Sequence, residues 1–223
     1  MPPYDSLPLS LTCRITHQKD FAFQKNNGDI ANRIRPKFLG EHHSKTAANL
    51  VKIELDDDGD ISIGTDRCSL YVTADSVFAV GFLVTPKSLW EKSHINEIPP
   101  MLELLFEERR SLSPVLFHVR LYFRFPSKEG LGLLKSRCCD ASLAVILGND
   151  IPSDINRFRM STKYDRNNFA DSLELEGSTG DVQLRYNREA PATAFPSYGA
   201  FLEAADLSGL AEELRAFIEP LLT

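Results

Sequence analysis

Long hydrophobic runs are missing from this chain of 223 residues. No stretch approaches the ~20 consecutive apolar residues of a membrane-spanning helix, which argues against a membrane partner. Residues 1–14 also lack the basic segment and the apolar core of a secretory signal. We therefore expect a cytoplasmic protein that does not associate with a membrane.

Cysteine is also scarce. Cys13 and Cys68 are isolated and Cys138 and Cys139 are adjacent, so their spacing matches neither a zinc-binding motif nor a CxxC redox pair. We expect reduced cysteines that pack as small apolar groups. A redox role for the adjacent pair is the alternative.

The signatures of common enzymes are absent as well. The sequence contains no HxxxH or HExxH metal pattern, no GxSxG nucleophile elbow and no GxxxxGK[ST] or GxGxxG phosphate loop. The segment "EGLGLLKS" at 129–136 matches neither phosphate loop. These absences favour a protein that is not an enzyme and that needs no cofactor or metal. An active site assembled from scattered residues, however, leaves no such pattern.

Negative charge exceeds positive charge overall, but not along the whole chain. The formal net charge is −6, which argues against wholesale nucleic-acid binding. Residues 109–166 nevertheless carry 11 Lys and Arg against 5 Asp and Glu, whereas the segments on either side are acidic. A basic middle between acidic flanks is the most distinctive feature of the composition.

Hydrophobic periodicity predicts a mixture of strands and helices. Alternating apolar and polar residues, or a short apolar run, indicate strands at 7–16, 50–55, 61–64, 78–84, 115–125 and 155–164, and a hairpin at 171–188. Helical spacing indicates a short helix from Asn27 that Pro36 limits, and further helices at 101–110, 127–147 and 198–222. We expect the last helix to break near Ser208 and Gly209.

The order of these elements repeats after residue 112. Each half contains a strand, a helix, an acidic strand, a tight hairpin, a strand and a helix in this order. We therefore predict an α+β fold with two similar halves, 1–112 and 113–223, each an antiparallel-rich sheet with helices packed on one face. No linker rich in Gly, Ser or Pro separates them, so we expect one compact unit. A diverged internal duplication is a hypothesis.

Four aspartates cluster in the turn between two expected strands: Asp56, Asp57, Asp58 and Asp60. Counted from Glu54, they supply some oxygen ligands of an EF-hand loop, but Thr65 stands where the bidentate glutamate belongs. The flanks also read as strands, whereas an EF-hand needs helices. Because an Asp-Gly pair favours a hairpin turn, we expect a solvated acidic hairpin that presents negative charge to a partner.

The expected strands at 115–125 and 155–164 concentrate basic residues at their outward positions. Their inward positions are apolar, and their outward positions hold His118, Arg120, Tyr122, Arg124, Arg157, Arg159 and Lys163. If the two strands are neighbours, these side chains form one basic face. The structural alternative is that Glu174 and Glu176 of the following hairpin neutralise this face through cross-strand ion pairs.

We predict a non-enzymatic interaction module or assembly subunit that binds a protein partner through this basic face. An acidic segment of the partner would make the contact. The first alternative is that the same face binds nucleic acid or a phosphate-bearing ligand, although Tyr122 is its single outward aromatic residue. The second alternative is an enzyme whose active-site residues are dispersed in the sequence.

Overall fold

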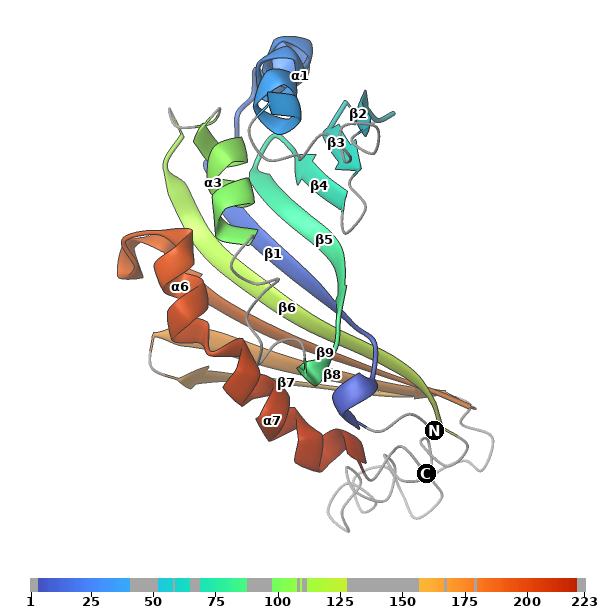
Figure 1. Ribbon diagram of the computed structural model, residues 1–223. Helices are drawn as coiled ribbons and strands as arrows, with labels where there is room; N and C mark the ends of the chain where they lie inside the picture. Colours follow the sequence, from blue (N-terminus) through green and yellow to red (C-terminus); the bar gives the residue numbers. More distant parts are fainter. Residues whose placement is uncertain are drawn as a thin grey trace.

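The computed structural model describes residues 4–40, 52–57, 59–64, 69–87, 98–107, 109, 112–127, 157–166, 168–178 and 180–219. These residues form one antiparallel sheet of nine strands, accompanied by helices (Figure 1). The fold is therefore α+β. No described helix is long and apolar enough to cross a membrane.

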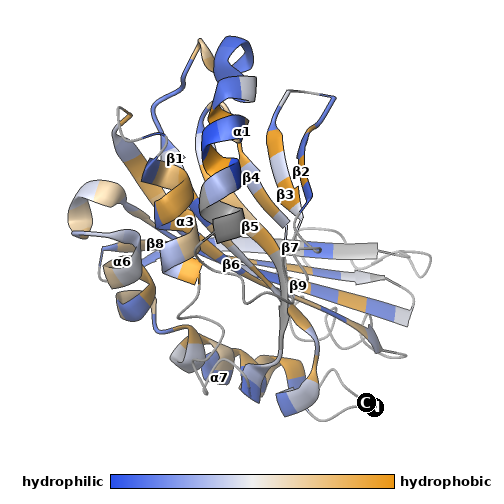
Figure 2. Ribbon diagram, turned by 45° about the horizontal axis from the view of Figure 1, so that its top comes forward, coloured by the Kyte–Doolittle hydropathy of each residue, from blue (hydrophilic) through white to orange (hydrophobic). Residues whose placement is uncertain are grey.

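The strands follow the alternation of hydrophobic and hydrophilic residues, which is visible along the ribbons in Figure 2. In chain order they are β1 (Leu9–His17), β2 (Lys52–Leu55), β3 (Ile61–Gly64), β4 (Ser69–Val72), β5 (Ser76–Val84), β6 (Pro114–Ser127), β7 (Arg157–Arg166), β8 (Phe169–Ser178) and β9 (Gly180–Pro191). Their order in the sheet is β2-β3-β4-β5-β1-β6-β9-β8-β7. Because β1 pairs with β6, residues 1–112 and 113–223 build a single continuous sheet rather than one sheet each.

The helices pack largely against one face of this sheet. They are α1 (Phe23–Gly40), α3 (Ile98–Glu107), α6 (Tyr198–Ala205) and α7 (Leu207–Ile218), with short 3-10 turns η1 (Tyr4–Ser6) and η3 (Ala192–Ala194). In Figure 1, α3, α6 and α7 lie in front of the sheet, and α1 lies near β2, β3 and β4. The inward residues of the strands and the apolar sides of the helices form one hydrophobic core.

Two helices differ from the sequence-based expectation. Helix α1 continues through Pro36 instead of ending before it. A proline removes one backbone donor, and α1 is held by its buried Phe23, Ile30 and Ile34, so packing outweighs this loss. The C-terminal helix breaks at Asp206, two residues before the expected position. The helix expected at 127–147 lies almost entirely outside the described residues.

One ion pair lies inside the core and joins three elements. Arg188 of β9 donates to both carboxylate oxygens of Asp171 in β8, at 2.8 and 2.7 Å, and to the carbonyl of Ala205 at the end of α6. Both side chains are buried. Because each buried charge is matched by its partner and by further hydrogen bonds, this cluster has a structural role.

Candidate functional site

The candidate site is the face of the sheet opposite α3, α6 and α7. Alternation along β6 buries Phe117, Val119, Leu121, Phe123 and Phe125 under the helices. The intervening residues point to the other face: His118, Arg120, Tyr122 and Arg124. We call the latter surface, formed by the outward residues of the strands, the open face.

Cross-strand register extends the open face from β6 to β7. The two strands are not neighbours, because β9 and β8 lie between them. One row of paired residues nevertheless runs from Arg124 through Gln183 and Glu176 to Arg159. A second row runs from Arg120 through Asn187 and Ser172 to Lys163. Arg157 is separated from Arg159 by one residue of β7, so the backbone places both on the same face of the strand. The side chain of Arg157 lies outside the described part.

Carboxylates of β8 and β9 neutralise the outer arginines of this face. Arg124 pairs with Asp181 at 3.2 Å, and Arg159 and Arg185 both approach Glu174 at 3.4 Å. Glu174 thus bridges two strands. Such exposed pairs contribute little to stability, on the order of 0–1 kcal/mol each. Their effect is to reduce the positive charge on the β7–β9 side of the open face, where two carboxylates meet three arginines.

At the centre of the face, two arginines lack an ion pair among the described residues, although Glu189 is paired with the neighbouring His118 across the strands. Neither Arg14 of β1 nor Arg120 of β6 forms an ion pair with a described residue. Arg120 donates from Nε to Asn187 Oδ1 at 2.5 Å, and Arg14 lies over the Phe78 ring at 4.5 Å. Burial lowers the pKa of Arg120, Arg14 and Arg185 lower it further, and the carboxylate of Glu174 opposes this shift in part. Two neighbouring guanidinium groups therefore repel each other and would be stabilised by an anion.

His118 lies between these two arginines. It pairs with Arg14 across the strands, and its Nε2 lies 3.4 Å from Asn187 Oδ1. Desolvation, followed by the positive charge of Arg120, lowers the pKa of His118 to about 4. The ring is therefore neutral at pH 7 and adds no charge. Its Nδ1 is buried without a hydrogen-bond partner among the described residues.

Aromatic side chains flank this cationic centre. Tyr71 of β4 stacks on Phe78 of β5 with ring centroids 4.9 Å apart, and Arg14 covers the other side of Phe78. Tyr122 donates to Gln183 Oε1 and lies under Arg185 at 5.5 Å. The open face thus presents three aromatic residues instead of the one expected from sequence.

Sequence reasoning missed several members of this centre: Arg14, Tyr71, Phe78, Arg185 and Asn187. Arg14 of β1 and Arg185 and Asn187 of β9 occupy outward positions in the alternation of their strands, which is the signal that could have identified them. Which residues of other strands lie beside them is set by strand order. Only the pairing of β1 with β5 and β6, and of β6 with β9, brings them together.

The aspartate cluster forms the expected hairpin between β2 and β3. Asp56 Oδ1 accepts a hydrogen bond from the amide of Asp60 at 2.8 Å, and Gly59 has φ of +80°. Asn27 of α1 donates to the carbonyl of Gly59 at 2.8 Å, so the turn is anchored to a helix. Asp57 is exposed, and Asp58 lies outside the described residues. Among described side chains no group of three metal-ligand residues occurs.

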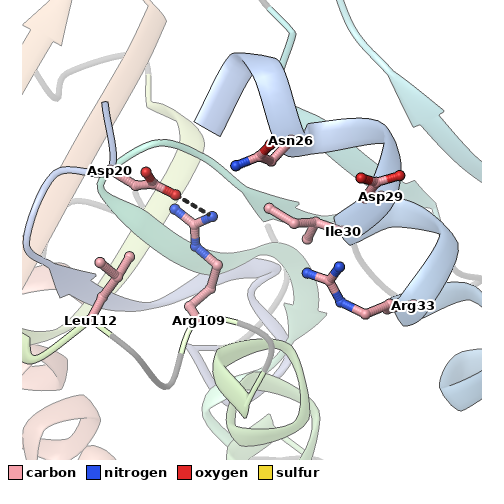
Figure 3. Close-up of a pocket in the computed structure, with 7 residues that line it drawn as sticks. All are labelled: Asp20, Asn26, Asp29, Ile30, Arg33, Arg109 and Leu112. Atoms are coloured by element: carbon pink, nitrogen blue, oxygen red, sulfur yellow. Dashed lines mark ion pairs between the residues drawn. The ribbon is translucent and has the colours of Figure 1, made fainter. Parts of the chain in front are cut away.

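A polar cavity of about 350 Å³ lies between α1 and the segment before β6 (Figure 3). Its lining is Asp20, Asn26, Asp29, Ile30, Arg33, Arg109 and Leu112. Arg109 is 2% exposed, pairs with Asp20 at 3.1 Å and lies over the Phe23 ring. The guanidinium is therefore held by this chain, and the lining contains carboxylates and guanidinium groups in equal number. We assign the cavity a structural role.

The arrangement on the open face is suited to binding an anion. His118 could accept a proton at Nδ1, but the side chains that lie beside it or pair with it are Arg14, Arg120, Asn187 and Glu189, and none of them is a nucleophile such as serine or cysteine. No protein-family model matches the chain, and no curated protein shows significant similarity to it. A function therefore has to be inferred from the side chains of this chain itself.

Proposed function

We propose that the protein is a non-enzymatic interaction module that binds an acidic segment of a protein partner through the centre of its open face. The observation that carries the proposal is the contrast between two groups of arginines. Arg124, Arg159 and Arg185 have carboxylate partners within the chain. Arg14 and Arg120 have no such partner among the described residues and lie close enough for Arg14 to lower the pKa of Arg120.

Binding of a carboxylate at this centre has a direct physical reason. Guanidinium groups form charge-assisted, often bidentate hydrogen bonds with carboxylates. A ligand anion would relieve the repulsion between Arg14 and Arg120 and would supply acceptors for donors such as Arg14 Nε, which is buried without a partner in the described part. The acidic groups of β8 and β9 beside this centre would restrict the register of the bound segment.

The test is binding of a labelled oligo-glutamate peptide, followed by fluorescence anisotropy at increasing salt. We expect Arg14→Gln/Arg120→Gln to weaken binding by about tenfold or more, because both anion-binding groups are removed. The matched control is Lys25→Gln/Arg35→Gln, which removes two exposed charges from α1 and should bind like the wild type. Unchanged binding by the Arg14/Arg120 variant would contradict the proposal.

A second candidate is single-stranded nucleic acid. The observation that favours it is the presence of Tyr71, Phe78 and Tyr122 beside the arginines, since sheets bind single strands with basic and aromatic residues together. A labelled single-stranded oligonucleotide in the same assay distinguishes the two. Tighter binding of the oligonucleotide than of the peptide, with a steep salt dependence, would favour this candidate.

Three further expectations belong to this proposal. We infer a cytoplasmic site of action and presentation of the acidic hairpin to a partner. We also infer that the two halves arose by duplication. The supporting observation is that each half places its first strand beside its last strand, as β1 beside β5 and β6 beside β9.

A further inference from the structure

Strand β7 forms one edge of the sheet. It pairs with β8 from Arg157 opposite Ser178 to Arg166 opposite Phe169, and no other described strand lies beside it. The strand at the other edge, β2, has four residues, whereas β7 has ten. Within the described chain, β7 therefore offers the longer unpaired edge.

In the described part of β7, both faces are open to solvent at residues 161–165. These residues are all exposed, and Tyr164 is 42% exposed. In β9, by contrast, every second residue from Val182 to Ala190 is buried under the helices. Residues 161–165 thus lie outside the core, and the described side chains leave room for an additional strand beside them.

An edge strand carries a row of backbone N–H and C=O groups that a second extended chain can pair with. We propose that β7 accepts an acidic, extended segment of a protein partner as a tenth strand of the sheet. This inference rests on the proposed function for the acidic character of the partner. It adds a second place of contact with that partner, at the edge of the sheet, where backbone pairing holds an extended segment.

The charges of β7 select an acidic strand. The strand contains Arg157, Arg159, Lys163 and Arg166 against a single Asp165. Arg159 and Lys163 share the open face, so they would lie opposite alternate side chains of the added strand. The neighbouring β8 already shows this complementarity, because its Glu174 lies 3.4 Å from Arg159.

A second copy of β7 fits this edge less well than an acidic strand does. Antiparallel pairing of two copies would double the excess of basic over acidic side chains at the junction. Since Asp165 is the single acidic residue of β7, any register between two copies pairs at most one acidic residue of each copy with a basic residue of the other. An acidic strand can place a carboxylate opposite several basic residues of β7 at once.

The experiment uses a labelled peptide of alternating valine and glutamate and the full-length protein. We expect the peptide to bind and to slow amide hydrogen exchange in β7, because its backbone pairs with that strand. Two control peptides should bind about tenfold more weakly. One carries lysine in place of glutamate, and the other has the same side chains but N-methyl groups that block backbone pairing.

The variant Arg159→Glu/Lys163→Glu should reverse the preference, binding the lysine peptide better than the glutamate peptide. Both side chains are exposed, so the fold should persist, which circular dichroism verifies. Equal binding of the N-methylated peptide would overturn the strand pairing and leave the proposed function standing, whereas the Arg14/Arg120 variant tests that function separately. A dimer that forms without peptide and is lost in the Arg159/Lys163 variant would overturn the inference in favour of a second copy.

Discussion

His118 is a residue whose role depends on its neighbours rather than on its type. Its side chain points to the open face, yet it is largely desolvated between Arg14 and Arg120, and its pKa falls to about 4. An unperturbed histidine has a pKa near 6.5. The folded protein thus keeps this ring neutral over a pH range in which the unfolded chain protonates it.

The pH dependence of stability should reveal this neutral ring. Between pH 6.5 and 4 the unfolded chain binds a proton at His118 and the folded protein does not, so falling pH favours unfolding. The stability that depends on the neutral ring is complete above pH 6.5 and is lost toward pH 4. Over this interval the free energy of unfolding should fall by up to about 3 kcal/mol more in the wild type than in His118→Gln.

Urea denaturation of both proteins at several pH values across the interval measures this difference. Both proteins contain the same carboxylates and the same His17, whose pKa is also lowered by burial. The contributions of these groups to the pH dependence of stability are therefore equal in the two proteins and cancel in the difference. Two stability curves that run parallel between pH 6.5 and 4 would mean that His118 is protonated in the folded protein.

At the scale of elements, the joint between α6 and α7 depends on one residue. Asp206 ends α6 in the left-handed conformation, with φ of 45°, and its carboxylate accepts a hydrogen bond from the amide of Gly209 at the start of α7. A β-carbon at position 209 would overlap the Asp206 carboxylate. The helix breaks at Asp206 rather than at Ser208 and Gly209. The reason is that an aspartate can both adopt a left-handed conformation and cap a helix.

The variant Asp206→Ala should lower the free energy of unfolding by about 2 kcal/mol, as it removes the cap and places alanine at positive φ. Asp206→Asn keeps a capping oxygen and tolerates this conformation, so it should be close to the wild type. Urea denaturation measures both. If the asparagine variant were as unstable as the alanine variant, the negative charge rather than the cap would be the cause.

The strands illustrate which elements can be predicted. In β6 the alternation of five buried apolar residues with polar ones is unbroken, and the strand lies where the sequence predicts it. The hairpin at Asp56–Asp60 also follows from local chemistry, since Asp-Gly accommodates the positive φ of Gly59. Helix α1 could not be predicted in length, because tertiary packing of Ile30 and Ile34 outweighs the local effect of Pro36.

For the whole molecule, the central pairing of β1 with β6 makes the halves interdependent. These strands pair from Leu9 opposite Phe123 to His17 opposite Pro114, and β1 buries Leu11 and Ile15 in the common core. The fragment 1–112 would therefore expose the whole edge of β1 together with part of that core. We expect this fragment to be unfolded or aggregated at neutral pH.

Size-exclusion chromatography and circular dichroism of the fragment 1–112 test this expectation. A monomeric fragment that unfolds cooperatively would contradict it and would show that the half folds independently. A folded homodimer of the fragment would also contradict it. In that case a second β1 would replace β6, as the duplication hypothesis allows.

The sequence alone determined the local features of this protein: the strands, the acidic hairpin, and the outward position of Arg120, Arg124, Arg159 and Lys163. Each depends on the period of two along a strand or on the backbone preferences of a few neighbouring residues. Tertiary structure decided which strands are neighbours. It placed β9 and β8 between β6 and β7, made Glu174 rather than Glu176 the ion-pair partner of Arg159, and left Arg14 and Arg120 without an ion pair among the described residues. The reason is that register between distant strands arises from burial of one common core, which no local pattern encodes.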